Sequence, residues 1–283
     1  MTAINQDFLQ AVRDEIKTTL AETVLARSME TEIDSLLSGK MLRTQLMFTL
    51  GNAIGTPKHK CLTAAAAVEM LHAASLLHDD VVDGGQLRRG TPALWVTHGP
   101  KVAVLTGDML LSLAFAKMAR SHPYAVPALA TTLQDMCDAE IEQEFADNHK
   151  TVAWDDCIRI ARGKTGSLFG FTAYCAAGEP SSLADDLAKA GTQLGVAYQL
   201  ADDLLDLQHN EAAIGKTLGT DAASGKNTAA TLLAHTHQTP ASLIQPILDE
   251  ATNALAAWPL VQQALQTYIH GTLQPLIETY TAA

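Results

Sequence analysis

The 283-residue sequence has few aromatic residues, few cysteines and few positive charges. Phe, Trp and Tyr make up 5% of it, which disfavours an all-β fold, because strands are enriched in aromatic and β-branched side chains. It carries 19 Lys and Arg against 31 Asp and Glu, a formal net charge of −12. This acidic balance argues against nonspecific nucleic-acid binding and against docking on anionic lipid, since both require a basic surface.

The cysteines are Cys61, Cys137, Cys157 and Cys175. They show no CxxC spacing, so we expect buried free thiols, with neither a zinc site nor a disulfide framework. The first residues lack the basic and apolar regions of a signal peptide. No uncharged apolar run reaches the roughly 20 residues that cross a bilayer. These absences predict a cytoplasmic protein without a transmembrane segment.

The sequence is rich in alanine and leucine, and 47% of it is hydrophobic. Apolar residues recur at helical spacing, and Gly or Pro interrupts them at short intervals. The predicted helices cover 5–36, 61–83, 99–120, 128–149, 154–175, 182–207 and 229–283. We therefore expect one all-α domain over residues 1–283.

The most distinctive stretch closes the helix predicted before residue 84. It places Asp79, Asp80 and Asp83 at the helix end and Arg88 and Arg89 directly after it. Residues one turn apart share a helix face, so Asp79 and Asp83 repel each other unless a cation is bound. Mg²⁺ takes carboxylate and phosphate oxygens, and arginine binds phosphate through paired N–H groups. The stretch predicts a magnesium–diphosphate site, with a solvated acidic helix end as the alternative.

The same pattern returns at the end of a second apolar helix. Asp202, Asp203 and Asp206 repeat the spacing, and Lys216 and Lys226 follow in glycine-containing loops. Two solvated acidic faces would not share both the apolar helix and the basic loop by chance. The repetition therefore favours paired metal-binding carboxylates.

Two further cation-containing pairs fit phosphate. Lys40 and Arg43 lie at the start of a predicted helix, where cations oppose the helix dipole unless an anion is bound. Ser38 is the expected cap of that helix. Lys164 and Thr165 lie inside an apolar helix, where a lysine reaching out to solvent is the alternative.

Glu69 and His72 match the ExxH pattern of di-iron helix bundles. That site needs a second ExxH, which the sequence lacks. A single histidine on a buried helix is usually a hydrogen-bonded core residue, so a functional role for His72 depends on its neighbours.

These motifs, in this order, resemble the trans-isoprenyl diphosphate synthases, the polyprenyl synthetase family. The resemblance runs from about Gly39 to Thr228. It departs from the family at Ser38, where a second glycine is usual, and at Thr44, where proline is usual. It implies a homodimer in which each subunit is an antiparallel bundle of about ten helices around a deep cavity, with the aspartate motifs facing across its mouth.

The resemblance also implies roles for single residues. The Mg²⁺ ligands would be Asp79, Asp83 and Asp202, with Asp80, Asp203 and Asp206 in or near the coordination shell. About three ions would be present with substrate bound. The ligands of the allylic diphosphate would be Arg88, Lys164 and Lys216, closed over by Lys226 and supported by Thr165 and Gln199. The ligands of isopentenyl diphosphate would be Lys40, Arg43, His72 and Arg89.

The implied activity is that of a prenyltransferase, which condenses isopentenyl diphosphate with an allylic diphosphate to an all-trans polyprenyl diphosphate. Mg²⁺ and cationic side chains would stabilise the departing diphosphate while the allylic carbon–oxygen bond ionises. The residues that carry this step would be Asp79, Asp83, Asp202, Lys164 and Arg88. A terpene cyclase shares the metal chemistry but usually has one aspartate motif of this kind.

In this family, the bulk of the residues just before the first aspartate motif limits how far the product grows. Ala74 and Ser75 stand there, and both are small. The motif also lacks the two-residue insertion common in bacterial short-chain enzymes. The resemblance therefore predicts a product longer than geranylgeranyl diphosphate. The alternatives are a farnesyl or geranylgeranyl diphosphate synthase, or a subunit of a heteromeric synthase.

Overall fold

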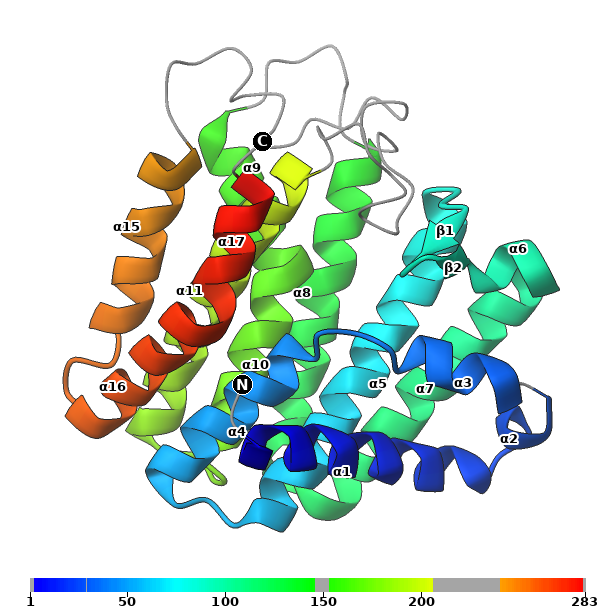
Figure 1. Cartoon of the computed structure of the whole chain (residues 1–283), viewed down its shortest axis with the longest axis horizontal. Coiled ribbons are helices and arrows are strands. Elements are labelled where there is room, and N and C mark those ends of the chain that lie inside the picture. Colours follow the sequence, from blue (N-terminus) through cyan, green and yellow to red (C-terminus); the bar gives the residue numbers. More distant parts are fainter. Residues whose placement is uncertain (1–2, 29, 146–152, 206–239, 282–283) are drawn as a thin grey trace.

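The computed structural model describes residues 3–28, 30–145, 153–205 and 240–281. These residues form a helical bundle with one short hairpin (Figure 1), which confirms the predicted all-α class. The elements up to and including the hairpin are α1 (Ala3–Ala21), α2 (Leu25–Ser28), α3 (Glu30–Leu36), α4 (Leu42–Ile54), α5 (Lys58–Val82), β1 (Leu87–Arg88) and β2 (Thr91–Pro92). Those that follow are α6 (Leu94–His98), α7 (Pro100–Ser121), η1 (Pro123–Ala125), α8 (Val126–Phe145), α9 (Trp154–Ala161), η2 (Arg162–Gly166), α10 (Ser167–Ala176) and α11 (Ser182–Leu205). The last are α15 (Pro240–Asn253), α16 (Pro259–Tyr268), η3 (Ile269–Leu273) and α17 (Gln274–Thr281).

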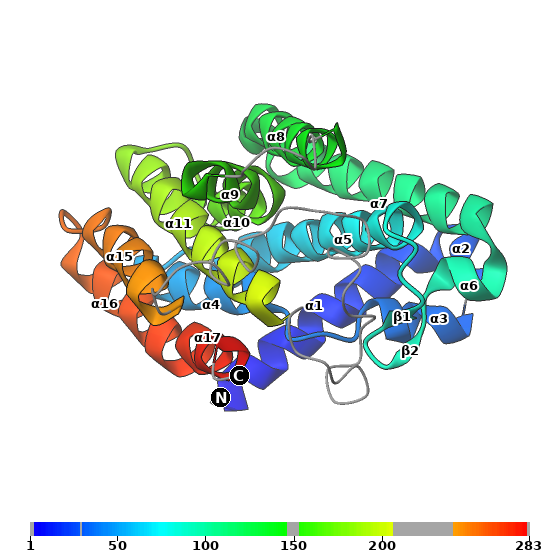
Figure 2. The ribbon, with the colours of Figure 1, turned by 90° about the horizontal axis from the view of Figure 1, so that it is seen from above.

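Helix α5 lies in the middle of the bundle, with α7 beside it and α4, α1 and α10 also against it (Figure 2). The run from Ala64 to Ala67 has no exposed surface. Alanine has the highest helix propensity, and its small side chain lets neighbouring helices approach closely. At the end of α5 the N–H of Asp83 donates to the carbonyl of Asp79 at 2.8 Å. The first aspartate motif therefore keeps helical geometry up to the last turn.

Helices α10 and α11 form the other closely packed pair near the site. A Cβ added at Gly195 would lie 2.6 Å from the Cα of Gly166, so the two backbones meet where only glycine fits. This approach brings the second half of α11 against η2. Helices α5 and α11 finish at the same, upper end of the bundle in Figure 1, so both aspartate motifs lie at that end.

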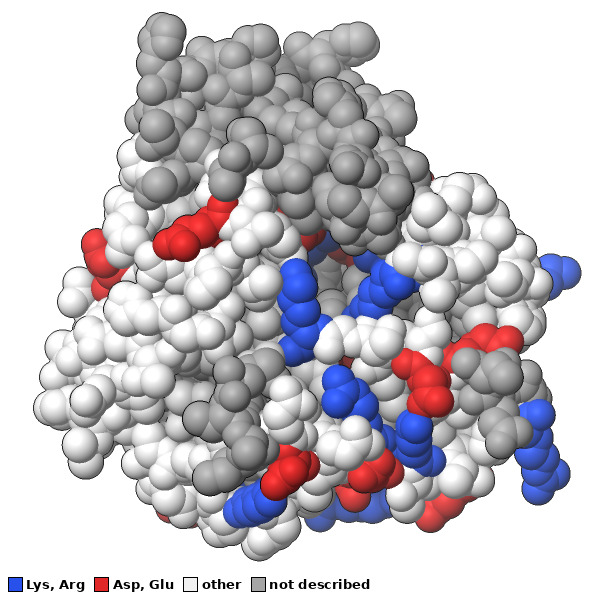
Figure 3. Space-filling model, in the orientation of Figure 1, with Lys and Arg blue, Asp and Glu red and all other residues white. Residues whose placement is uncertain are grey.

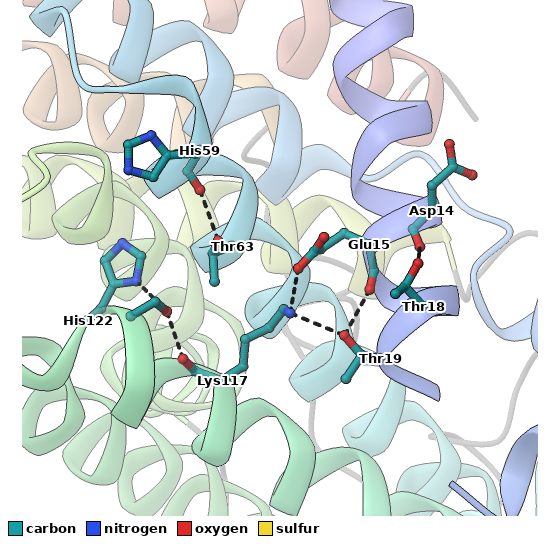
Figure 4. A network of polar contacts seen from close by, with 9 residues as sticks. Asp14, Glu15, Thr18, Thr19, His59, Thr63, Lys117 and His122 are labelled. Atoms are coloured by element: carbon teal, nitrogen blue, oxygen red, sulfur yellow. Dashed lines mark hydrogen bonds and ion pairs between the residues drawn. The ribbon is translucent and has the colours of Figure 1, made fainter. Parts of the chain in front are cut away.

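Helix α1 lies in the lower part of Figure 1, where it crosses in front of α5 and α7, and polar contacts join it to α7 (Figure 4). Nζ of Lys117 lies 2.6 Å from Oε1 of Glu15 and 3.1 Å from Oγ1 of Thr19. The Lys117 side chain is only 14% exposed, so this pair is screened less by water than an ordinary surface pair. It holds α1 across the bottom of the bundle.

Two local expectations were wrong. Helix α4 is preceded by Met41 in a left-handed conformation, with φ 48°, and not capped by Ser38, whose Oγ donates to the carbonyl of Ser35. Cys137 is exposed, whereas the other three thiols are buried. The helix predicted over 154–175 is present as α9, η2 and α10, and η2 within it is a π-helical turn. Parts of the helices predicted over 128–149, 182–207 and 229–283 lie outside the described residues.

Helices α5 and α7 are long and apolar enough to cross a membrane, judged by length and composition alone. Buried core helices pass the same test, and 67% of the most apolar part of α5 is buried, against 33% in α7. The absence of a transmembrane segment stays a prediction.

Candidate active site

The predicted ionic residues that the structure describes lie on α5, the hairpin, η2, α11, the segment before α4 and the first turn of α4. Figure 3 shows Lys and Arg side chains around a hollow in the middle of one face. Three predicted residues, Asp206, Lys216 and Lys226, lie outside the described part of the chain. The others are half-buried or buried, with the exception of Lys40, which is exposed.

Asp79 is the most strongly perturbed carboxyl group of the first motif. Burial raises its pKa to about 7, and the negative charges of Glu140 and Asp83 add to this, while Lys164 and Arg88 oppose it. A raised carboxyl pKa means that the ionised form lacks compensation. A divalent cation at Asp79 and Asp83 would supply that compensation.

Asp80 turns to the hairpin. It is 3% exposed, and its Oδ1 accepts hydrogen bonds from Arg88, with Nε at 3.0 Å and Nη2 as a second donor. Burial raises the pKa of Asp80, although Arg88 opposes it. Burial would lower the pKa of Arg88, but Asp80, Asp79 and Asp202 outweigh it and the pKa is raised. One guanidinium group is therefore attracted to carboxylates of both aspartate motifs.

Lys164 is held by α8. Its Nζ lies 2.7 Å from Oε1 of Glu140 and 3.3 Å from Oε1 of Gln143. Burial would lower the pKa of Lys164, but Glu140 and Asp79 outweigh it, so the pKa is raised and the ammonium stays charged. The π-helical turn η2 places this lysine, and π-helical turns often occur at functional sites. Glu140 had no assigned role in the sequence; the acidic run in α8 was the available signal.

In the second motif, two hydrogen bonds from uncharged donors lead to the carboxylate of Asp203. Nε2 of Gln199 donates to Oδ1 of Asp203 at 2.8 Å. The hydroxyl of Thr165 donates to Oε1 of Gln199. Thr165 and Gln199 thus form one hydrogen-bonded chain from η2 to Asp203, and the supporting role expected for both stays a prediction.

Arg43 is a buried cation with an unused donor. Its side chain lies over the ring of Phe169, with Cζ 4.7 Å from the ring centroid. Its Nε has no hydrogen-bond partner among the described residues. Burial lowers the pKa of Arg43, and Glu69 opposes this. An unpaired buried donor is costly, and an anionic oxygen would satisfy it.

His72 lies within the field of three arginines. Burial lowers its pKa well below the usual value, and Arg43, Arg89 and Arg88 lower it further. The imidazole is therefore neutral at pH 7, so it offers one N–H donor and one acceptor. The three neighbouring arginines distinguish His72 from a core histidine that has only apolar surroundings.

Backbone strain is concentrated beside the predicted isopentenyl ligands. Among the described residues, Met41 and Arg89 are the non-glycine residues with positive φ, 48° and 53°. Nη1 of Arg89 donates to the carbonyl of Leu36 at 3.0 Å. Nζ of Lys40 donates to the hydroxyl of Tyr280 on α17. Such conformations persist where the surrounding structure enforces them, and they cluster at functional sites.

Glu69, the glutamate of the ExxH pattern, has a local partner. Its Oε1 accepts from the backbone N–H and the hydroxyl of Thr44, at 3.2 and 2.7 Å. This explains Thr44, where the family usually has proline, because proline offers neither donor. No group of three His, Cys, Asp or Glu in the described ranges is close enough to hold a metal ion.

The chain-length positions differ in their surroundings. Ala74 is completely buried, whereas Ser75 is half-buried and its Oγ donates to the carbonyl of His72 at 2.9 Å. Both lie on α5 within two turns of Asp79. Their effect on product length stays a prediction.

Comparison with known proteins decides the family. A family model described as Polyprenyl synthetase matches residues 24–265. The chain belongs to the polyprenyl synthetase family. The resemblance drawn from the aspartate motifs is thereby confirmed.

Relatives of different product length are about equally similar. The chain is 34% identical over 237 residues to a geranylgeranyl diphosphate synthase of Mycobacterium tuberculosis, covering 76% of this chain and 67% of the relative. It is 33% identical over 248 residues to a nonaprenyl diphosphate synthase of the same organism, covering 82% and 74%. The chain spans between 55% and 74% of the length of these and a related farnesyl diphosphate synthase.

Solved structures agree with the fold. A polyprenyl synthase from Caulobacter crescentus, complexed with calcium and isoprenyl diphosphate, has a TM-score of 0.81 at 26% identity, covering 99% of this chain and 96% of that one. The relatives compared here are prenyl diphosphate synthases, which confirms the predicted enzyme family of trans-prenyltransferases.

Proposed function

We propose that this polyprenyl synthetase condenses isopentenyl diphosphate with an allylic diphosphate to an all-trans polyprenyl diphosphate. The observation that carries the proposal is the meeting of two cation sets at one end of the bundle. Arg88 interacts electrostatically with both Asp79 and Asp202, while His72 lies in the electrostatic field of Arg43 and Arg89. Two anion-binding regions fit a reaction with two diphosphate substrates.

In this proposal Asp79, Asp83 and Asp202 bind Mg²⁺, about three ions in all, and Asp80 and Asp203 lie near the shell because Arg88 and Gln199 already occupy their Oδ1 atoms. Support comes from the oxygen donors, from the raised pKa of Asp79, and from the calcium in the Caulobacter relative. The metal would stabilise the negative charge that develops on the departing diphosphate. Roles for Asp206, Lys216 and Lys226 stay predictions.

The side chains share the remaining work. Arg88 and Lys164 bind the allylic diphosphate, and carboxylates keep both permanently charged, so they stabilise the leaving group without reorganising. Isopentenyl diphosphate is bound by the ligand set Lys40, Arg43, His72 and Arg89. His72, being neutral, contributes a directional hydrogen bond and not charge. The double bond of isopentenyl diphosphate attacks the allylic cation, and the proton lost afterwards passes to the departing diphosphate.

The small side chains of Ala74 and Ser75 favour a product longer than geranylgeranyl diphosphate. Relatives that make farnesyl, geranylgeranyl, octaprenyl and nonaprenyl diphosphate are 32–34% identical to this chain. A short-chain synthase is therefore the alternative, and so is a subunit of a heteromeric synthase.

We further propose that the chain acts as a cytoplasmic homodimer whose subunit is one domain over residues 1–283. The exposed surface of α7 supports the proposal of a dimer. Its outer side exposes Val104 and Leu105 by 39% and 68%. Exposed apolar side chains that cluster on one helix are typical of protein–protein contacts.

The test is incubation of the purified chain with isopentenyl and farnesyl diphosphates and Mg²⁺, with and without a chelator. We expect metal-dependent release of diphosphate and a product longer than geranylgeranyl. Failure to release diphosphate from the chain alone would favour the partner-subunit alternative. A wild-type product that ends at farnesyl or geranylgeranyl would overturn the chain-length proposal.

Product length is tested by adding bulk before the first motif. Ser75→Phe, at a half-buried position, and Ala74→Phe should both shorten the product, because a larger side chain would block the growing chain. Ala74→Phe also overpacks a fully buried position, at a cost of about 1–3 kcal/mol, so Ser75→Phe is the safer variant. Unchanged product length in a folded Ser75→Phe enzyme would contradict the role of this position.

A further inference from the structure

The last described helix, α17, contacts the residue that lies two positions before α4. The hydroxyl of Tyr280 accepts a hydrogen bond from Nζ of Lys40, although 240 residues separate them in the chain. The same ammonium lies over the Tyr280 ring, 4.7 Å from its centroid. Tyr280 is only 8% exposed, so the surrounding residues restrict the motion of its side chain. One side chain thus provides two attractive contacts for the cation.

Tyr280 is itself positioned by α11. Its ring lies 6.1 Å from the ring of Tyr198, at an interplanar angle of 54°. Tyr198 lies within the electrostatic field of Asp202 and Arg43. The contact between Lys40 and Tyr280 is therefore continuous with both the second aspartate motif and the buried arginine.

The backbone around Lys40 is also constrained. The carbonyl of Lys40 accepts from Nε2 of Gln45 at 2.7 Å, and Met41 has φ 48°. A Cβ on Gly39 would lie 2.8 Å from Nη2 of Arg89, so the chain passes directly against that guanidinium. With the backbone set, the remaining freedom of Lys40 is in its long side chain, and this is the part that Tyr280 restrains.

We propose that Tyr280 is a positioning residue for isopentenyl diphosphate, which holds the ammonium of Lys40 where the diphosphate binds. This inference rests on the proposed function. An ammonium has three N–H donors, so one bond to Tyr280 leaves two for diphosphate oxygens. A lysine side chain has about 2 kcal/mol of rotamer entropy to lose on binding, and Tyr280 removes part of that loss in advance. The benefit falls on isopentenyl diphosphate and not on the allylic substrate, whose proposed ligands are Arg88 and Lys164.

The test is Tyr280→Phe, which keeps the ring over Lys40 and removes only the hydroxyl. We expect KM for isopentenyl diphosphate to rise about fivefold, equivalent to about 1 kcal/mol, with KM for the allylic substrate and kcat close to wild type. The matched control is Tyr268→Phe, because the Tyr268 hydroxyl also joins the C-terminal helices to α4, through the carbonyl of Leu42 at 3.0 Å. That control should leave both KM values unchanged.

A double-mutant cycle with Lys40→Gln separates positioning from general loosening. Tyr280→Phe should add nothing in the Lys40→Gln background. An unchanged KM for isopentenyl diphosphate in Tyr280→Phe, equal rises in both KM values, or additive effects in the cycle would overturn the inference. Titration calorimetry of isopentenyl diphosphate binding provides the same comparison without turnover. Wild type that binds isopentenyl diphosphate but forms no product would overturn the proposed reaction alone, and wild type that does not bind it would overturn both.

Discussion

The two aspartate motifs have the same spacing but different surroundings. In the first, Asp80 is 3% exposed and bound by the guanidinium of Arg88. In the second, the corresponding Asp203 is half-buried and bound by the uncharged amide of Gln199. The first motif therefore has a permanent positive charge built into it, and the second has a hydrogen-bond chain from Thr165.

The difference shows how one sequence pattern can serve two tasks. Arg88 brings a full positive charge and two donors to Asp80, whereas Gln199 brings one uncharged donor to Asp203, so the first motif is the more costly to break. Arg88 is also attracted to Asp202, which joins the motifs through a cation that belongs to the first. The second motif depends on a neutral network that changes less in energy when altered. We therefore expect substitution of the first aspartate of each motif, Asp79 or Asp202, to reduce activity equally. Substitution of the second aspartate, Asp80 or Asp203, should reduce stability by different amounts.

The largest loss of activity should come from substitution of the first aspartate of each motif. Asp79→Asn and Asp202→Asn each remove one negative charge from the proposed metal site, and we expect kcat to fall by about 1000-fold, or about 4 kcal/mol. Steady-state assays with saturating Mg²⁺ measure this loss. Loss of activity in one variant and near-normal turnover in the other would break the proposed equivalence of the motifs.

Substitution of the second aspartate of each motif should lower the free energy of unfolding by different amounts. Asp80→Asn leaves Arg88 without its ionic partner, at a cost of about 2 kcal/mol, less than for a fully buried pair because Arg88 is 33% exposed. Asp203→Asn keeps a hydrogen-bonding side chain beside Gln199 and should cost less than about 1 kcal/mol. Denaturant unfolding of both variants gives the two values. Equal costs would show that the charge of Arg88 makes no difference to the first motif.

The raised pKa of Asp79 predicts a pH dependence of the metal-free protein. Its pKa is about 7 when folded and about 3.9 when unfolded. Between these values the folded chain keeps a proton that the unfolded chain releases, so stability falls as pH rises from about 4 to about 7. The slope from this group is at most about 1.4 kcal/mol per pH unit. Asp79→Asn should remove that part of the slope in unfolding measured with chelator present; parallel curves would contradict the assignment.

The smallest effect should come from the neutral chain of the second motif. Thr165→Val removes the hydroxyl that donates to Gln199 and loosens the amide that holds Asp203. We expect a loss of about 1 kcal/mol in stability and about a fivefold lower kcat. Thr165→Ser keeps the hydroxyl and should stay close to wild type in both. Wild-type stability and kcat in Thr165→Val would contradict a role for the hydrogen bond from Thr165 to Gln199.

Much of this arrangement was predictable because it depends on local spacing. Helical periodicity located α5, α7, α8 and α11 to within a few residues where the structure describes them. The repeated aspartates and the adjacent cations identified the family, since each motif is a run of neighbouring residues. Ser38 was misassigned as a cap because the left-handed Met41 shifts the start of α4 to Leu42, and no local propensity favours methionine there.

The sequence by itself determined which residues carry charge, on which helices they lie and how they are spaced along the helix ends. Only the tertiary structure decided which charges meet. Glu140 pairs with Lys164 because η2 lies against α8, where a Cβ on Gly163 would come within 2.7 Å of the carbonyl of Asp135. Lys40 meets Tyr280 because α17 packs against α11 while α16 packs against α4. The physical reason is that helix formation is governed by neighbours along the chain, whereas the pairing of buried ions depends on packing between helices far apart in sequence.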